Sequence, residues 1–77
     1  MVVKPENMRM AKGAVVVAWR NYGNRAFRVN LNGKHAQPLR DAEKLGLAWW
    51  PKPDRCALTP SGVQLATEYW PDGGVSA

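Results

Sequence analysis

Cysteine is nearly absent from this chain of 77 residues, which contains only Cys56. A single cysteine cannot form an internal disulfide, and such sparse use is typical of a reducing compartment, so we predict a cytoplasmic protein. The chain also lacks a CxxC pair and any cluster of histidine with cysteine. The sequence therefore predicts no structural zinc site and no other metal site.

Long apolar runs are missing as well. The longest is AVVVAW at residues 14–19, far below the roughly 20 residues that a membrane-spanning helix needs. The first residues, MVVKPENMRMAKG, contain no apolar stretch of the kind found in signal peptides. We therefore expect no membrane partner.

Catalytic motifs are not found either. The sequence has no GxSxG, Walker or HExxH pattern. His35 stands in a polar stretch beside Lys34, with no carboxylate or cysteine placed to make it a catalytic base. Cys56 falls in an apolar, strand-like run, which favours burial over a nucleophilic role. We expect no enzyme activity and no cofactor.

Acidic residues are scarce in the first half of the chain. Residues 1–40 contain eight lysines and arginines against Glu6, a net charge of +7, whereas residues 41–77 contain three against five acids, a net charge of −2. This asymmetry favours a surface that faces a polyanion. The alternative is that the charge only keeps a small protein soluble.

Tryptophan, by contrast, is abundant. Hydrophobic residues make up 45% and charged residues 22% of the chain, which fits one small globular domain. Each large aromatic side chain can bury roughly 150–250 Å². We therefore expect the four tryptophans to supply much of the core; they are Trp19, Trp49, Trp50 and Trp70.

Residues 14–32 predict a β-hairpin. The first run, AVVVAWR, is rich in β-branched residues, and in the second, RAFRVNLN, apolar residues alternate with polar ones. The NYGN stretch between them tolerates the positive φ of a tight turn. This hairpin would group Arg20, Arg28 and Asn30 on its outer face, which is either a nucleic-acid ribbon or a solvated sheet face.

The second half of the chain predicts a helix, a hairpin and another helix. The first helix starts at Pro38 and stops before Gly46, and a hairpin with Pro51 and Pro53 at its tip follows. Thr59 and Pro60 then open a helix that ends before Pro71. We predict an α+β domain at residues 14–70 in the order β-β-α-β-β-α, after a flexible basic arm at residues 1–13 and before a disordered tail at residues 71–77.

Residues 39–66 resemble the C-terminal half of winged-helix DNA-binding domains of the multiple-antibiotic-resistance type. In that family a recognition helix ends in a Gly-Leu step, a wing with an Asp-Arg pair follows, and Leu-Thr-x-x-Gly opens the next helix. The matching segments here are Leu45-Gly46-Leu47, Asp54-Arg55 and Leu58-Thr59-Pro60-Ser61-Gly62.

The resemblance implies that Arg40 and Lys44 lie near a DNA groove, and that Lys52 and Arg55 lie on a wing beside the backbone. The family has two helices before its recognition helix, where residues 14–32 here read as strands. The domain is thus either a reduced winged helix or another α+β fold with a similar hairpin.

Two functions remain open from the sequence. The first is a small nucleic-acid-binding protein, a DNA-binding regulator or accessory factor, with DNA favoured over RNA. The second is a protein-interaction module, an inhibitor or adaptor of the kind that phages and mobile elements often carry, which docks on a larger protein through exposed tryptophan and arginine residues. In either case we expect a monomer or homodimer. The candidate nucleic-acid contacts are Arg20, Arg25, Arg28, Lys34, Arg40, Lys44, Lys52 and Arg55.

One tryptophan is a candidate anchor for either function. Trp49 and Trp50 cannot both face inward in an extended strand, because neighbours point to opposite faces. We predict that Trp50, beside the proline-rich tip, is the outer one. It would stack on a base or anchor a protein interface.

Overall fold

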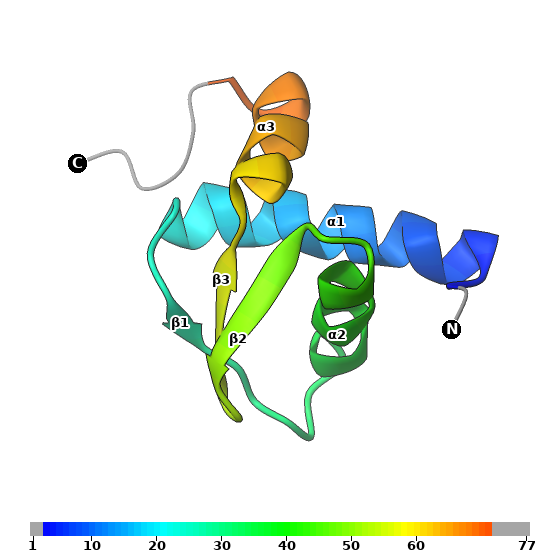
Figure 1. The fold of residues 1–77 in the computed structure, drawn as a ribbon, viewed down its shortest axis with the longest axis vertical. Coiled ribbons are helices and arrows are strands. Elements are labelled where there is room, and N and C mark those ends of the chain that lie inside the picture. The colour runs from blue at the N-terminus through cyan, green and yellow to red at the C-terminus, as the bar shows by residue number, and fades with distance from the viewer. Residues whose placement is uncertain (1–2, 72–77) are drawn as a thin grey trace.

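The computed structural model describes residues 3–71, and its described part is an α+β fold with three helices and one antiparallel three-stranded sheet (Figure 1). The strand order in the sheet is β1-β3-β2. The elements are α1 (Pro5–Tyr22), β1 (Phe27–Arg28), α2 (Ala36–Lys44), β2 (Ala48–Lys52), β3 (Arg55–Leu58) and α3 (Pro60–Tyr69).

Helix α1 overturns the predicted first hairpin, since residues 14–22 are helical. Ala11, Ala14, Val15 and Ala18 are its buried residues, and their spacing of three and four places them on one helical face. Burial of this face outweighs the strand preference of the three consecutive valines, because tertiary packing overrides local propensity. The helix begins at Pro5, within the segment predicted as an arm, and ends at Tyr22, with Gly23 as its C-cap at a φ of 66°.

Strand β1 is all that remains of the second predicted strand. Phe27 and Val29 are buried and Arg28 is exposed, as the alternation predicts, but Leu31 is 51% exposed. β1 pairs with β3 instead of with residues 14–20. The order is therefore α-β-α-β-β-α, and one described helix precedes α2.

The predicted second hairpin and its flanking helices are confirmed. α2 begins two residues before Pro38, which its first turn tolerates because that N–H has no helical partner. It stops before Gly46, whose φ is +76°. β2 and β3 pair in antiparallel fashion with a register shift between Trp49 and Lys52.

Thr59 fixes the start of α3. Its Oγ1 accepts a hydrogen bond from the backbone N–H of Gly62 (3.1 Å) and donates one to the carbonyl of Gly46 (2.6 Å). The backbone N–H of Thr59 also donates to the carbonyl of Leu47 (3.1 Å). The end of α2 and the start of α3 are thereby held together.

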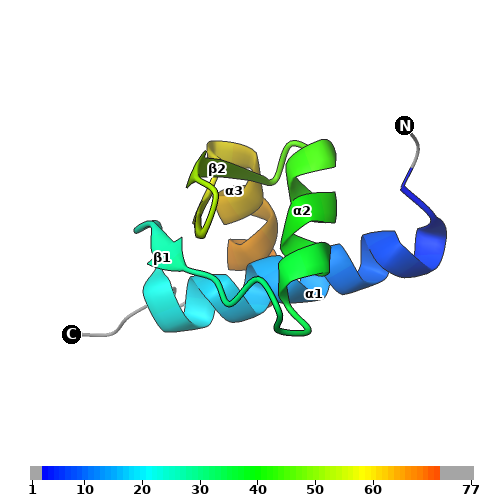
Figure 2. The same ribbon diagram turned by 90° about the horizontal axis from the view of Figure 1, so that it is seen from below.

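The core lies between α1 on one side and α2, α3 and the sheet on the other (Figure 2). It consists largely of small residues, and Val15 and Cys56 are the largest fully buried side chains among the described residues. The tryptophans contribute less than predicted: Trp19 and Trp50 pack against the core while partly exposed, and Trp49 and Trp70 are 51% and 40% exposed. None of the described helices combines the length and apolar character that crossing a membrane takes.

Candidate nucleic-acid interface

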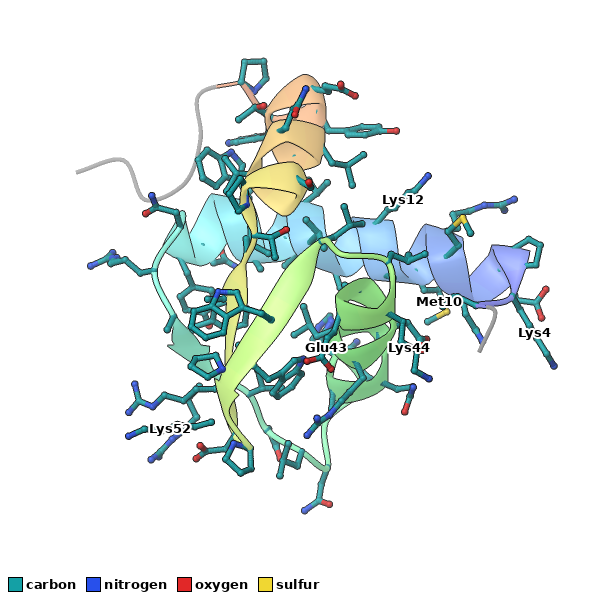
Figure 3. All side chains as sticks on the ribbon, viewed as in Figure 1. Lys4, Met10, Lys12, Glu43, Lys44 and Lys52 are labelled. Carbon is teal, nitrogen blue, oxygen red and sulfur yellow. The ribbon has the colours of Figure 1, made fainter. Side chains whose placement is uncertain are left out.

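Three cations stand side by side across the three strands near the hairpin tip. Arg28 of β1 lies opposite Arg55 of β3, and Arg55 lies opposite Lys52 of β2. All three are exposed. We call Arg28, Arg55 and Lys52 the cationic row; Figure 3 labels Lys52 at its outer end.

The electrostatics of the cationic row are unfavourable in isolation. Directly opposed side chains on antiparallel strands have Cβ atoms about 4.5–5.5 Å apart, and like charges at such positions are destabilising. Among residues 3–71, the row makes one ion pair, between Arg28 Nε and Asp54 Oδ2 at 3.7 Å, with both side chains well exposed. Exposed pairs of this kind contribute little. The row therefore keeps a net positive charge that an anionic partner would stabilise.

The pleat of the sheet decides which way the row faces. Phe27 and Cys56, the neighbouring cross-strand pair, are both buried. Because successive residues of a strand point to opposite faces, Arg28 and Arg55 project from the outer face of the sheet, away from the core.

Arg40 joins α2 to the hairpin. Its guanidinium carbon lies 4.1 Å from the centroid of the Trp50 ring, and Nη2 donates a hydrogen bond to the carbonyl of Pro53 (3.3 Å). Trp50 Nε1 in turn donates to the carbonyl of Leu39 (3.4 Å). These contacts set the position of the hairpin relative to α2. An arginine has five N–H donors, so Arg40 retains donors for a ligand.

The prediction that Trp50 is the outer tryptophan is wrong. Trp49 is 51% exposed and lies opposite Ala57, whereas Trp50 is partly buried against α2. The neighbouring pair, Ala48 and Leu58, faces the core, so the alternation of the strand places Trp49 outward. The sequence alone did not indicate which of the two alternating sets of residues in this strand would face the core.

The remaining predicted cations lie in several places. Lys44 is exposed in the last turn of α2, and Lys34 precedes that helix. Arg25 is exposed between α1 and β1. Arg20, in the last turn of α1, lies 4.2 Å over the ring of Trp70. The structure thus gathers Arg28, Lys52, Arg55 and Arg40 around one hairpin and leaves Arg20 at a contact between α1 and the end of α3.

The exposed surface of α2 carries polar side chains. Gln37 and Lys44 are exposed there. Gln37 Nε2 donates to Oδ1 of the buried Asp41 (3.1 Å). That hydrogen bond orients the Gln37 amide and supplies the buried carboxylate with a partner, which buried polar groups require.

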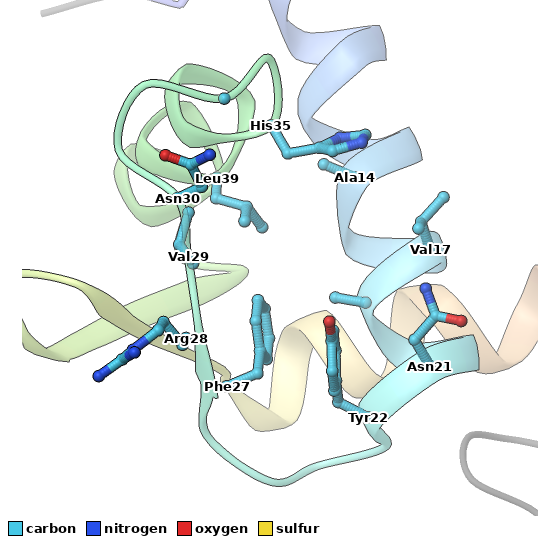
Figure 4. Close-up of a pocket in the computed structure, with 12 residues that line it drawn as sticks. Ala14, Val17, Asn21, Tyr22, Phe27, Arg28, Val29, Asn30, His35 and Leu39 are labelled. Atoms are coloured by element: carbon cyan, nitrogen blue, oxygen red, sulfur yellow. The ribbon is translucent and has the colours of Figure 1, made fainter.

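A hollow that the sequence did not predict lies between α1 and residues 27–39 (Figure 4). Its volume is about 300 Å³, and the rings of Tyr22 and Phe27 stack in its wall with centroids 4.5 Å apart. A second hollow along α1 adjoins it, lined in part by Met10 and Val17. The spacing of these two residues with Ala14 would have indicated a helical stripe, had residues 14–20 not been assigned to a strand.

Cys56 has no features of a reactive thiol. It is fully buried, and burial together with the charge of Glu43 raises the pKa of its thiol from 9.0 to about 11. Raising a thiol pKa removes the thiolate that nucleophilic or metal-binding chemistry needs. Within residues 3–71, no group of three or more His, Cys, Asp or Glu side chains is placed to hold a metal ion.

Comparison with known proteins finds no matching family model, no matching curated protein and no matching solved structure.

Proposed function

We propose that this protein binds nucleic acid, as a DNA-binding regulator or accessory factor whose cationic row binds the backbone phosphates. The observation that carries the proposal is the row itself, in which Arg28, Arg55 and Lys52 oppose one another across three strands. Phosphate neutralisation by lysine and arginine supplies most of the affinity in such complexes, while contacts to base edges add sequence preference.

The dimensions of the row suit a phosphate backbone. Neighbouring strands lie about 4.7–4.9 Å apart, so the row spans about 10 Å between its outer Cα atoms. One DNA strand rises about 3.4 Å per phosphate. Three consecutive phosphates of one strand thus span about 7 Å along the helix axis, which long lysine and arginine side chains with Cα atoms spread over about 10 Å can reach by converging.

Helix α2 would set the orientation of the domain on the duplex. It precedes the hairpin directly, as in the winged-helix domains that residues 39–66 resemble, and Arg40 ties the two together. Gln37 and Lys44 would then face the major groove, which admits a helix in B-form DNA. The major groove of duplex RNA is too deep and narrow for such a contact, which is why DNA is preferred.

The test is a salt titration of binding to a short DNA duplex, followed by fluorescence anisotropy. The slope of log K against log salt is negative, and each lost phosphate contact makes it less steep by about 0.9, so removing the row should reduce its magnitude by about 2.7. The variant carries alanine at all three positions of the cationic row. Absence of binding to the duplex at low salt would refute the proposal.

A matched control separates the row from net charge. It removes the same total charge from exposed positions at the N-terminal end of α1, well away from Lys52 in Figure 3, by changing Lys4, Arg9 and Lys12 to alanine. The control should keep a slope close to that of the wild-type protein. Equal losses in both triple variants would show a diffuse attraction to the whole positive surface.

A second candidate function is protein binding at the hollows beside α1. Arg28, Lys34 and His35 line these hollows, and their described lining includes no acidic residue. Two copies of the chain would bring like charges together there, so the occupant we infer is an acidic amphipathic segment of another protein.

The two candidates respond to different substitutions. Val17 is 42% exposed and lines both hollows. Val17→Glu should repel a synthetic acidic amphipathic peptide while leaving duplex binding unchanged. Alanine at Lys52 and Arg55, which line neither hollow, should weaken duplex binding and leave peptide binding unchanged. Peptide binding that survives Val17→Glu would exclude the hollows as its site.

A further inference from the structure

Trp49 occupies the outer face of the sheet, beside the cationic row. It is directly opposite Ala57, which is 5% exposed although it lies on that same outer face. Trp50 and Trp70 are each covered by an arginine, but within the described residues no ring or cation is recorded against Trp49. An aromatic surface is therefore open to a ligand.

The distance between this ring and the row follows from the strand geometry. Arg55 precedes Ala57 by two residues on β3, so both lie on one face about 6.6–6.8 Å apart along the strand. Arg28 lies across from Arg55 on the same face. One ring and two guanidinium groups thus share a face small enough for a single nucleotide to contact them together.

The surroundings of Trp49 favour a nucleotide over a protein side chain. The central anchors of protein interfaces sit in well-packed, fully desolvated pockets. Here the nearest outward-facing neighbours along β3 and β1 are Arg55 and Arg28, both exposed. Aromatic rings flanked by cations form the usual platform for unpaired bases, which stack on the ring while the cations follow the backbone.

We propose that the outer face of the sheet binds an unpaired nucleotide of single-stranded DNA. The base stacks on Trp49, and Arg55 and Arg28 bind the adjoining phosphates. This inference rests on the proposed function and deepens it: the preferred ligand is a duplex with a single-stranded extension, in which the duplex contacts α2 and the extension crosses the sheet.

The experiment compares a blunt duplex with the same duplex carrying a thymidine overhang, using the full chain. The wild-type protein should bind the overhang substrate more tightly than the blunt one. Loss of one stacked base weakens binding by about 5- to 140-fold. Trp49→Ala should therefore lose affinity for the overhang substrate by that factor and keep its affinity for the blunt duplex.

Two further variants make the result specific. Trp49→Phe retains a ring and should preserve most of the preference for the overhang. Tyr69→Ala removes another exposed aromatic side chain, on α3, which is 65% exposed, and should change neither affinity. Thermal unfolding of each variant shows whether it is folded; should Trp49→Ala fail to fold, Trp49→Leu, which is apolar but has no ring, takes its place and must lose the preference for the overhang.

Failure of this inference is distinct from failure of the proposed function. Equal binding of both substrates by the wild-type protein overturns the stacking site alone, as does a Trp49→Ala variant that keeps the preference. Absence of binding to either substrate at low salt overturns both.

Discussion

The contact between α3 and the segment after α2 predicts opposite effects for one substitution at two glycines. A Cβ atom at Gly62 would lie 1.9 Å from the carbonyl oxygen of Leu47, whereas at Gly13 it would meet nothing within 4 Å. Both residues lie in helices, and neither has a positive φ. Gly62→Ala should therefore destabilise the domain, and Gly13→Ala should stabilise it.

The expected magnitudes follow from competing terms. Alanine is favoured over glycine in a helix interior by about 0.8–1.0 kcal/mol, so Gly13→Ala should stabilise by about that amount. At Gly62 the same gain is opposed by overpacking, which costs about 1–3 kcal/mol or more. The obstacle there is backbone, so relief would also require α3 to shift and weaken the hydrogen bond from Thr59 N to Leu47 O, worth about 0.5–1.5 kcal/mol.

Urea denaturation of the two variants and the wild-type protein measures the difference. We expect a gap of about 1.5–4.5 kcal/mol in the free energy of unfolding between the two alanine variants, because the propensity gain is shared and only the overpacking and hydrogen-bond costs differ. In a domain of this size each kcal/mol shifts the melting temperature by about 4–8 °C. If Gly62→Ala is as stable as Gly13→Ala, the close approach of α3 to Leu47 is incorrect.

Three further predictions concern single side chains. Thr59→Ala should lower the free energy of unfolding by about 1–2 kcal/mol, measured in urea, because it removes the helix cap and the hydrogen bond to Gly46 O, and Thr59→Ser should restore most of it. The raised pKa of Cys56 stabilises the fold fully below pH 9.0, and this contribution should disappear as pH rises from 9.0 towards 11, because the unfolded thiol ionises first. A Cys56→Ala variant should lose less stability over that range, and an identical pH dependence would contradict the assignment. Arg40→Ala should lower stability by about 0.5–1 kcal/mol through loss of the contact with Trp50, with Arg40→Lys giving only partial recovery; no change in the urea midpoint would argue against that contact.

The second half of the fold was predictable because its signals are local. Gly46 stops a helix through its positive φ, and Thr59 with Pro60 starts one. The prolines at the hairpin tip restrict the chain between the two strands. Each signal acts within a few residues, so a short stretch of sequence is enough to predict where the helix or turn begins and ends.

The first half failed for the opposite reason. A run of three valines favours a strand locally, and only burial on the rest of the domain selects the helix. The alanines at positions 11, 14 and 18 carry that information, since small residues let helices approach closely. These alanines favour the helix only because α2 and α3 pack against it, and both of those helices lie far along the chain.

The wrong prediction of a first hairpin also gave the wrong set of residues for the candidate site. A hairpin at residues 14–32 would have set Arg28 near Arg20, in a surface made wholly from the basic half of the chain. Because residues 14–22 form α1, β1 pairs with β3 instead, and Arg28 joins Arg55 and Lys52 from the half whose net charge is −2. Two acids of that half leave the row net positive: Asp41 is buried against Gln37, and Asp54 makes an exposed pair with one member of the row, Arg28. Strand pairing thus decides which cations lie together on the surface that a polyanion would contact. Counting charges along the sequence does not reveal this grouping.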